Sequence, residues 1–310
     1  MLTTQDDLFQ PVIELPEPVR ADRYRRLIGL DDIKTRLRKE AMLLADPQRL
    51  QLWAEKFHGP EVAATTLFTD RAPLFVFAGD VGCGKSALAE SFGCDLADAL
   101  DLPVYLYRLK LATRGSGLVG EMTALIGAAF EHLHLQGAKS KSTRGINAVS
   151  VLVVDEADAL VQSRENQQMH HEDRAGVDAF LAGVDSLAGA QVPVLVVLCT
   201  NRLGALDPAI MRRAAATFVF DRPDSAQRLT ALRHALHGID VPAATLNRLA
   251  ELTGPDGTRP GYTYSDLTQR LVPTAVMDAF PDSALTDEIL LRTVRAIEPT
   301  PIFEENRVAP

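Results

Sequence analysis

Cysteine and long apolar runs are both scarce in this sequence of 310 residues. The three cysteines, Cys83, Cys94 and Cys199, form no C-x-x-C pair. This pattern excludes a disulfide framework and a cysteine-based zinc site, and it is typical of reduced thiols in a cytoplasmic protein. No run of about 18 consecutive apolar residues is present, and Asp6 and Asp7 stand where a signal peptide requires positive charge. We therefore expect neither export nor a membrane span.

Positively charged residues are also fewer than negatively charged ones. The chain has 32 Lys and Arg against 41 Asp and Glu, a formal net charge of −9, and its pI is about 5.3. An acidic balance disfavours electrostatic wrapping of nucleic acid, which is therefore not the expected partner. Hydrophobic residues make up 46% of the chain, enough for a sizeable core, and the length favours about two domains.

Short apolar runs alternate with longer helical patterns through the middle of the chain. The runs are rich in Val, Leu and Phe and occupy 74–79, 104–109, 149–155, 192–200 and 217–220. Continuous apolar runs indicate strands buried on both faces, and helices between them provide parallel crossovers. The expected fold class is α/β, a doubly wound parallel sheet with its five strands in the order 5-1-4-3-2.

Proline marks the ends of this α/β region. Three prolines fall within the first 18 residues, which excludes a long helix and indicates a flexible arm. After Pro223 the strand pattern stops and helical patterns continue, which predicts a small all-helical domain. The expected divisions are an N-terminal arm at 1–23, the α/β domain at 24–222, the helical domain at 223–298 and a C-terminal tail at 299–310.

The segment after the first expected strand matches the pattern G-x-x-x-x-G-K-[ST]. It reads Gly79-Asp80-Val81-Gly82-Cys83-Gly84-Lys85-Ser86, followed by Ala87. Between a strand and a helix, these glycines let backbone N–H groups fold around phosphates, and the helix N-terminus adds its dipole. Lys85 is expected to reach the outer phosphates, and Ser86 to hold Mg²⁺. Residues 79–87 are therefore expected to bind ATP.

Polar side chains follow two other expected strands. Asp155 and Glu156 end the run at 149–155, and Asn201 follows the run at 192–200. Ligands bind at the carboxyl ends of parallel strands, so Asp155 is expected to hold the metal and Glu156 to activate the attacking water as the catalytic base. Asn201 is expected to bond to the γ-phosphate or to that water, the alternative being a simple turn residue.

Two adjacent arginines, Arg212 and Arg213, end a short helical pattern. They are candidate catalytic residues, the alternative being partners of the helix dipole. In this order the motifs resemble those of the AAA+ ATPases over roughly 24–298. The segment at 28–34 looks like the linker before the AAA+ core, and DEADAL at 155–160 looks like the Walker B motif. Asn201 looks like sensor 1, and the two arginines look like the arginine-finger region. The resemblance implies a P-loop NTPase with a helical lid and a homo-oligomeric ring, usually a hexamer, in which the finger reaches a neighbour's ATP.

A finer resemblance concerns the partner. Gly115 to Met122 and the sequence Arg213-Ala214-Ala215 look most like the pachytene-checkpoint ATPases, which remodel HORMA-domain proteins. With its short N-terminal segment the chain resembles their bacterial relatives, which are encoded beside antiphage cyclic-nucleotide signalling (CBASS) genes. The resemblance implies a Mg-ATP-dependent ring ATPase whose protein substrate is a HORMA-domain regulator.

Three departures from the family pattern are present. The finger region of the family often has a second arginine two or three places on, where this chain has Ala215 and Ala216, so Arg212 and Arg213 are expected to share the role. The lid sensor arginine of the checkpoint group falls at Ser265, so this contact is missing or is supplied by Arg259 or Arg270. The aromatic residue of the pore loop falls at Leu111 or Ala112. Two alternatives remain, an AAA+ ATPase acting on DNA, of transposition or loader type, and a slow nucleotide-gated scaffold. The acidic pI disfavours the first, and the missing pore aromatic leaves the second open.

Overall fold

The computed structural model describes residues 4–69, 71–110, 121–143, 145–157, 160 and 171–302. The chain divides into two compact units. Unit 1 comprises Met1–Arg26, Asp32–Ala78 and Ser86–Phe218, and unit 2 comprises Leu27–Asp31, Gly79–Lys85 and Val219–Pro310. This division differs from the single boundary expected after residue 222, because unit 2 also contains two short segments from the first third of the chain.

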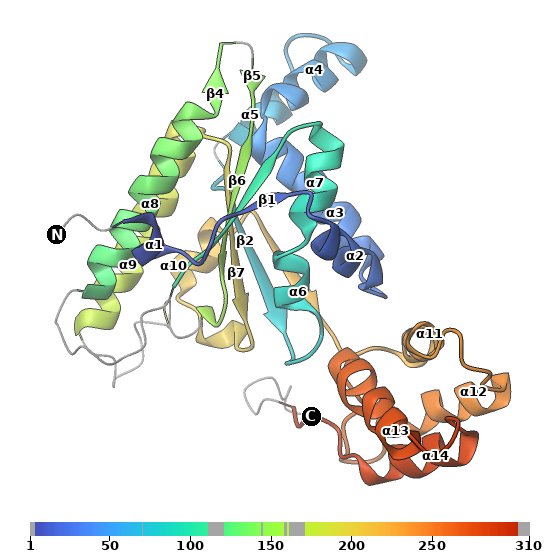
Figure 1. Ribbon diagram of the computed structural model, residues 1–310. Coiled ribbons are helices and arrows are strands. Elements are labelled where there is room, and N and C mark those ends of the chain that lie inside the picture. The colour runs from blue at the N-terminus through green and yellow to red at the C-terminus, as the bar shows by residue number, and fades with distance from the viewer. Residues whose placement is uncertain are drawn as a thin grey trace. The chain divides into compact units, whose positions relative to one another are not determined.

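A six-stranded sheet forms the centre of unit 1 (Figure 1). Its strands lie in the order β1 (Ile13–Leu15), β3 (Val104–Arg108), β6 (Val149–Val154), β7 (Val194–Thr200), β2 (Leu74–Gly79) and β8 (Ala216–Phe220). β3, β6, β7 and β2 pair in parallel. Every residue of β6 and β7 is buried, which explains their continuous apolar sequences. The α/β fold and the predicted order of its five core strands are confirmed.

The sixth strand, β1, corrects the expectation of a flexible arm at 1–23. α1 (Gln5–Leu8), β1 and α2 (Pro18–Arg26) form there, and β1 pairs antiparallel with β3. Leu8, Phe9 and Leu15 are each at most 2% exposed. Proline prevents a long helix but permits a short strand at a sheet edge, where a missing N–H breaks no ladder bond. Burial of apolar side chains therefore decides the structure of this segment.

Helices cover both faces of the sheet. α8 (Glu121–Lys139) and α9 (His171–Ala190) lie together on one face, with α3 (Asp31–Ala45) and α7 (Phe92–Leu100) on the other (Figure 1). Phe130 and Phe180 pack edge to face between α8 and α9, with ring centroids 5.2 Å apart. Further elements of unit 1 are α4 (Gln48–Phe57), α5 (Ala63–Thr69), α6 (Lys85–Ala89), the hairpin β4 (Lys141–Ser142) and β5 (Gly145–Ile146), the turn η2 (Leu203–Ala205) and α10 (Pro208–Arg213).

No helix within the described ranges is long and apolar enough to cross a membrane.

The C-terminal part of unit 2 is helical, as expected. It contains α11 (Ser225–Ala235), α12 (Ala243–Leu252), the π-helix η3 (Asp266–Leu271), α13 (Val272–Ala279) and α14 (Asp287–Ala296). Asp224 and Gln227 form a capping box that begins α11. Asp266 is fully buried and accepts hydrogen bonds from Thr263, Arg270 and Thr300. The chain after α14 is therefore fastened to the start of η3.

Candidate nucleotide-binding and hydrolysis site

The predicted phosphate loop leads from β2 into α6 with the backbone that its glycines permit. Gly79, Gly82 and Gly84 have φ angles of +145°, +76° and +99°. A Cβ on Gly79 would collide with the carbonyl oxygen of Phe220, and one on Gly82 would lie 2.7 Å from Thr263 Oγ1. Glycine is therefore required at both positions for conformation and for space.

Lys85 is buried in this loop and only 6% exposed. Its Nζ donates to the carbonyl oxygens of Gly79 and Asp80 at 2.9 and 2.7 Å. The ammonium group is thus held among backbone carbonyls that a phosphate oxygen could replace. Burial raises the pKa of the neighbouring Cys83 thiol to about 12, so this side chain is a neutral packing group at physiological pH.

Ser86 and Asp155 meet inside unit 1. Ser86 Oγ donates to Asp155 Oδ1 at 3.0 Å, and the same oxygen accepts from the backbone N–H of Glu156 at 3.0 Å. Glu156 has φ +51°, a conformation uncommon for a residue with a side chain. The turn after β6 therefore fixes Asp155 toward Ser86 and leaves the Glu156 side chain exposed.

A hydroxyl and a carboxylate this close fit Mg²⁺, which takes oxygen ligands and keeps several waters. Within the described part of the chain, no three or more His, Cys, Asp or Glu residues gather as a metal cage. That arrangement suits a metal held by one or two protein oxygens together with substrate phosphates.

Asn201 lies at the same sheet edge as this turn. In the ladder, Val154 of β6 pairs with Leu198 of β7, and Thr200 pairs with Ala78 of β2. β7 continues two residues past the partner of Val154, so Asn201, which follows β7 directly, lies just beyond the carboxyl end of β6, where Asp155 and Glu156 follow. The predicted convergence of Asp155, Glu156 and Asn201 at one edge agrees with this register.

The two arginines at the end of α10 differ in their surroundings. Arg213 donates to Asp185 of α9 through Nε and Nη2, at 2.7 and 2.9 Å. Arg212 is exposed, and no described residue forms an ion pair with it. Although adjacent in the sequence, the two arginines thus have different surroundings.

The lid positions that depart from the family pattern can also be placed. Ser265 donates its backbone N–H to Gly82 O at 3.1 Å, within unit 2. Arg259 pairs with Glu298, and Arg270 pairs with Asp266. Both arginines predicted as substitutes for the sensor are thus engaged inside the lid. The pore-loop positions Leu111 and Ala112, and most of the stretch from Gly115 to Met122, lie outside the described residues.

Sequence reasoning missed one residue beside the phosphate loop. Arg222, two residues after β8, forms an ion pair with Asp80, with Nε–Oδ2 at 2.6 Å. An acidic residue inside a phosphate-binding motif was the available signal, because a carboxylate there requires a counter-charge. Because the two residues are 142 positions apart, no local sequence pattern indicates that Arg222 is the partner of Asp80.

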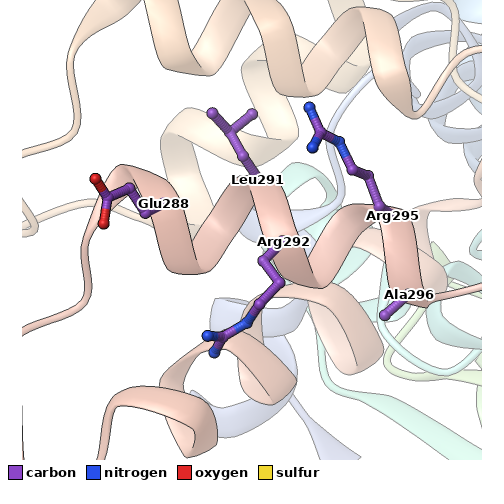
Figure 2. Close-up of a pocket in the computed structure, with 5 residues that line it drawn as sticks. All are labelled: Glu288, Leu291, Arg292, Arg295 and Ala296. Atoms are coloured by element: carbon purple, nitrogen blue, oxygen red, sulfur yellow. The ribbon is translucent and has the colours of Figure 1, made fainter.

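A surface hollow of about 510 Å³ lies elsewhere in unit 2 and contributes nothing to this chemistry. Its lining residues all belong to α14, and they are Glu288, Leu291, Arg292, Arg295 and Ala296. Their side chains diverge from the one helix rather than converging on a common point (Figure 2). No motif residue takes part in it.

Comparison with known proteins identifies the family. The sequence model of the ATPase family associated with various cellular activities (AAA) matches residues 75–222. A curated relative, CD-NTase-associated protein 6 of Escherichia coli strain MS 115-1, is 47% identical over 96% of this chain and 96% of its own length. The chain belongs to the AAA ATPase family.

Among the solved structures that match this AAA ATPase, two bacterial ones share 46% and 37% of its sequence. Trip13 in an E. coli MS115-1 complex of HORMA, CdnC and Trip13 superposes with a TM-score of 0.92 at 46% identity, covering 97% of this chain and 99% of that one. Rhizobiales Trip13 gives 0.75 at 37% identity, covering 95% and 100%. The resemblance to bacterial relatives of the checkpoint ATPases is confirmed. As a family member this ATPase binds nucleotide and hydrolyses ATP.

Proposed function

We propose that this AAA ATPase uses Mg-ATP hydrolysis to remodel a HORMA-domain protein in bacterial antiphage signalling of the CBASS type. The observation that carries the proposal is its similarity, at 46% identity and a TM-score of 0.92, to a chain solved together with HORMA and CdnC. The name of its curated relative, CD-NTase-associated protein 6, supports the same setting. Both comparisons extend over nearly the whole chain.

Nucleotide binding is assigned to the phosphate loop. Residues 79–87 bind ATP, with the N–H groups of the loop directed at the phosphates and Lys85 exchanging its two carbonyl partners for phosphate oxygens. Ser86 and Asp155 hold Mg²⁺, because their oxygens already lie 3.0 Å apart. The metal supplies charge neutralisation at the phosphates.

Hydrolysis is assigned to three further residues. Glu156, exposed at the end of β6, takes the proton of the attacking water. Asn201, directly after β7, orients that water or the γ-phosphate. Arg212 neutralises the charge that develops on the phosphate, whereas Arg213 holds α10 against α9.

Arg212 acts in trans under this proposal. It is exposed at the end of α10, and among the described residues of its own chain it has no ionic partner. A finger supplied by a neighbour requires a homo-oligomeric ring, and we propose a hexamer. The proposed divisions of each subunit are a large ATPase part at 24–222, a helical lid at 223–298 and a tail at 299–310.

The test is reconstitution with a HORMA-domain protein as the partner. We expect the partner to increase phosphate release and to change conformation on a native gel only with Mg-ATP. The Glu156→Gln variant should bind partner and ATP without converting the partner, and DNA should leave the rate unchanged. Stimulation by DNA alone would favour the DNA-acting class. A slow rate with no conversion of the HORMA protein would favour the nucleotide-gated scaffold.

A further inference from the structure

The phosphate loop of this chain contains an acid. Asp80 is its second residue, and its backbone carbonyl accepts a hydrogen bond from Lys85 Nζ. A carboxylate next to a bound triphosphate repels it, and the repulsion grows with the number of phosphate charges. Asp80 therefore opposes the binding that the rest of the loop promotes, unless its charge is neutralised.

Arg222 supplies that neutralisation. Its Nε lies 2.6 Å from Asp80 Oδ2, and the two side chains are only 13% and 12% exposed. Ion pairs with so little solvent contact are weakly screened by salt. The net charge that the loop presents to an anion is thus set by Arg222, a residue far from the loop in the sequence.

Arg222 also ties the loop to the lid segment inside unit 2. Its Nη1 donates to Gly261 O at 2.6 Å. Four residues later, Ser265 N donates to Gly82 O at 3.1 Å. The phosphate loop is therefore joined to residues 261–265 at two points, one charged and one through the backbone.

Stability alone does not account for this ion pair. Asp80 Oδ1 and Arg222 Nη2 are buried, and neither has a hydrogen-bond partner within the described ranges. A buried pair that is incompletely satisfied costs desolvation free energy that its attraction only partly offsets. Apolar residues would stabilise the same space at least as well, so the pair calls for a functional explanation.

We propose that Arg222 is a positioning residue for nucleotide binding: it neutralises Asp80 and holds the phosphate loop to the lid, so that affinity depends on phosphate charge through this pair. The proposal rests on the proposed phosphate-binding role of residues 79–87. Arg259 and Arg270 pair with carboxylates inside the lid, whereas Arg222 pairs with Asp80 of the loop.

The experiment compares Arg222→Gln, Asp80→Asn and the double variant in the full chain. Fluorescent AMP, ADP and ATP are titrated without Mg²⁺, where phosphate charges are least masked. In Arg222→Gln, affinity for ATP should fall on the order of tenfold, that for ADP less, and that for AMP least. The double variant should recover most of the loss, Asp80→Asn alone should bind ATP at least as tightly as wild type, and Arg222→Lys should keep most of the affinity.

The graded response separates positioning from mere folding. Thermal unfolding of each variant reports whether it folds, and a structural role would weaken AMP and ATP equally. An equal loss for all three nucleotides, or no recovery in the double variant, would overturn the proposal. Lys85→Ala is the separate check on the loop itself: if that variant binds ATP like wild type, residues 79–87 do not hold the phosphates and the assigned binding site is wrong.

Discussion

Arg213 and Asp185 form a bidentate ion pair that fastens the end of α10 to α9, with contacts of 2.7 and 2.9 Å. The hydrogen bond to Asp185 raises the pKa of Arg213, which is charged at any physiological pH. The preceding residue, Arg212, is exposed. One arginine is thus fixed within its own chain, and the other is available to a neighbouring molecule.

Arg212→Ala should reduce ATP hydrolysis by roughly 10³-fold without changing stability, as the loss of an arginine finger does. Arg213→Ala should cost at most about 1 kcal/mol of stability, because both partners are partly exposed, and should reduce activity much less. Phosphate release and urea unfolding measure the two effects. Asp185→Asn is the matched control, since it loosens Arg213 and keeps both arginines. If Arg213→Ala matches Arg212→Ala in activity while Asp185→Asn is normal, both arginines act on phosphate.

Glu156→Gln should bind Mg-ATP like wild type and hydrolyse it about 10²- to 10⁴-fold more slowly. Lys85, Ser86 and Asp155 would still hold the phosphates and metal, while the water loses its base. Nucleotide titration and single-turnover hydrolysis separate the two steps. Turnover close to wild type would show that another group takes the proton.

Phe9→Ala should destabilise the protein by about 3 kcal/mol or more. Phe9 is 1% exposed and packs against the rings of Tyr107 and His132, at centroid distances of 5.2 and 5.5 Å. Val19→Ala, at a position 66% exposed in the same N-terminal region, is the control and should change stability by less than about 0.5 kcal/mol. Urea unfolding of both variants measures these changes in stability. Identical unfolding curves for the two variants would indicate that the segment at 1–23 is a flexible arm.

Asp266 should make the lid sensitive to acid. Burial would raise its pKa, but hydrogen bonds from Thr263, Thr300 and Arg270 lower it below 3.8. A carboxyl with a lowered folded pKa stabilises the fold fully above its unfolded pKa, and this contribution is lost as the pH falls through the folded value. Asp266→Asn should therefore cost about 2–4 kcal/mol at pH 7, and the cost should shrink below about pH 4. Thermal unfolding between pH 7 and pH 3 tests this, and a cost independent of pH would contradict it.

Much of the fold was open to prediction because the signals are local. A strand buried on both faces must be apolar along its length, and β2, β6 and β7 carry that pattern. β1 carries no such signal, because its three residues lie between prolines and only Leu15 among them is buried. Its structure depends on β3, more than 80 positions away, against which residues 13–15 pair.

The candidate site also contains some residues with a local sequence signal and some without one. Lys85, Ser86 and Asp155 stand in motifs with a fixed local spacing, so the sequence alone predicts them as site residues. The difference between Arg212 and Arg213 depends on Asp185, which lies 28 positions from Arg213 on another helix. No local pattern encodes such a pair, since it arises from the packing of α9 against the end of α10.

The antiparallel strand β1 has a consequence for the chain in a crowded cell. An uncovered edge of a sheet offers unpaired N–H and C=O groups to any other strand, which is a common route to aggregation. Here the edge of β3 is covered by the three-residue strand Ile13–Leu15, a further bridge joins Phe9 to Leu109, and proline stands at positions 11 and 16. A strand this short and flanked by residues without an N–H is a poor template for further pairing. Copies concentrated in a ring of the kind proposed would thus find little on this side through which their sheets could fuse.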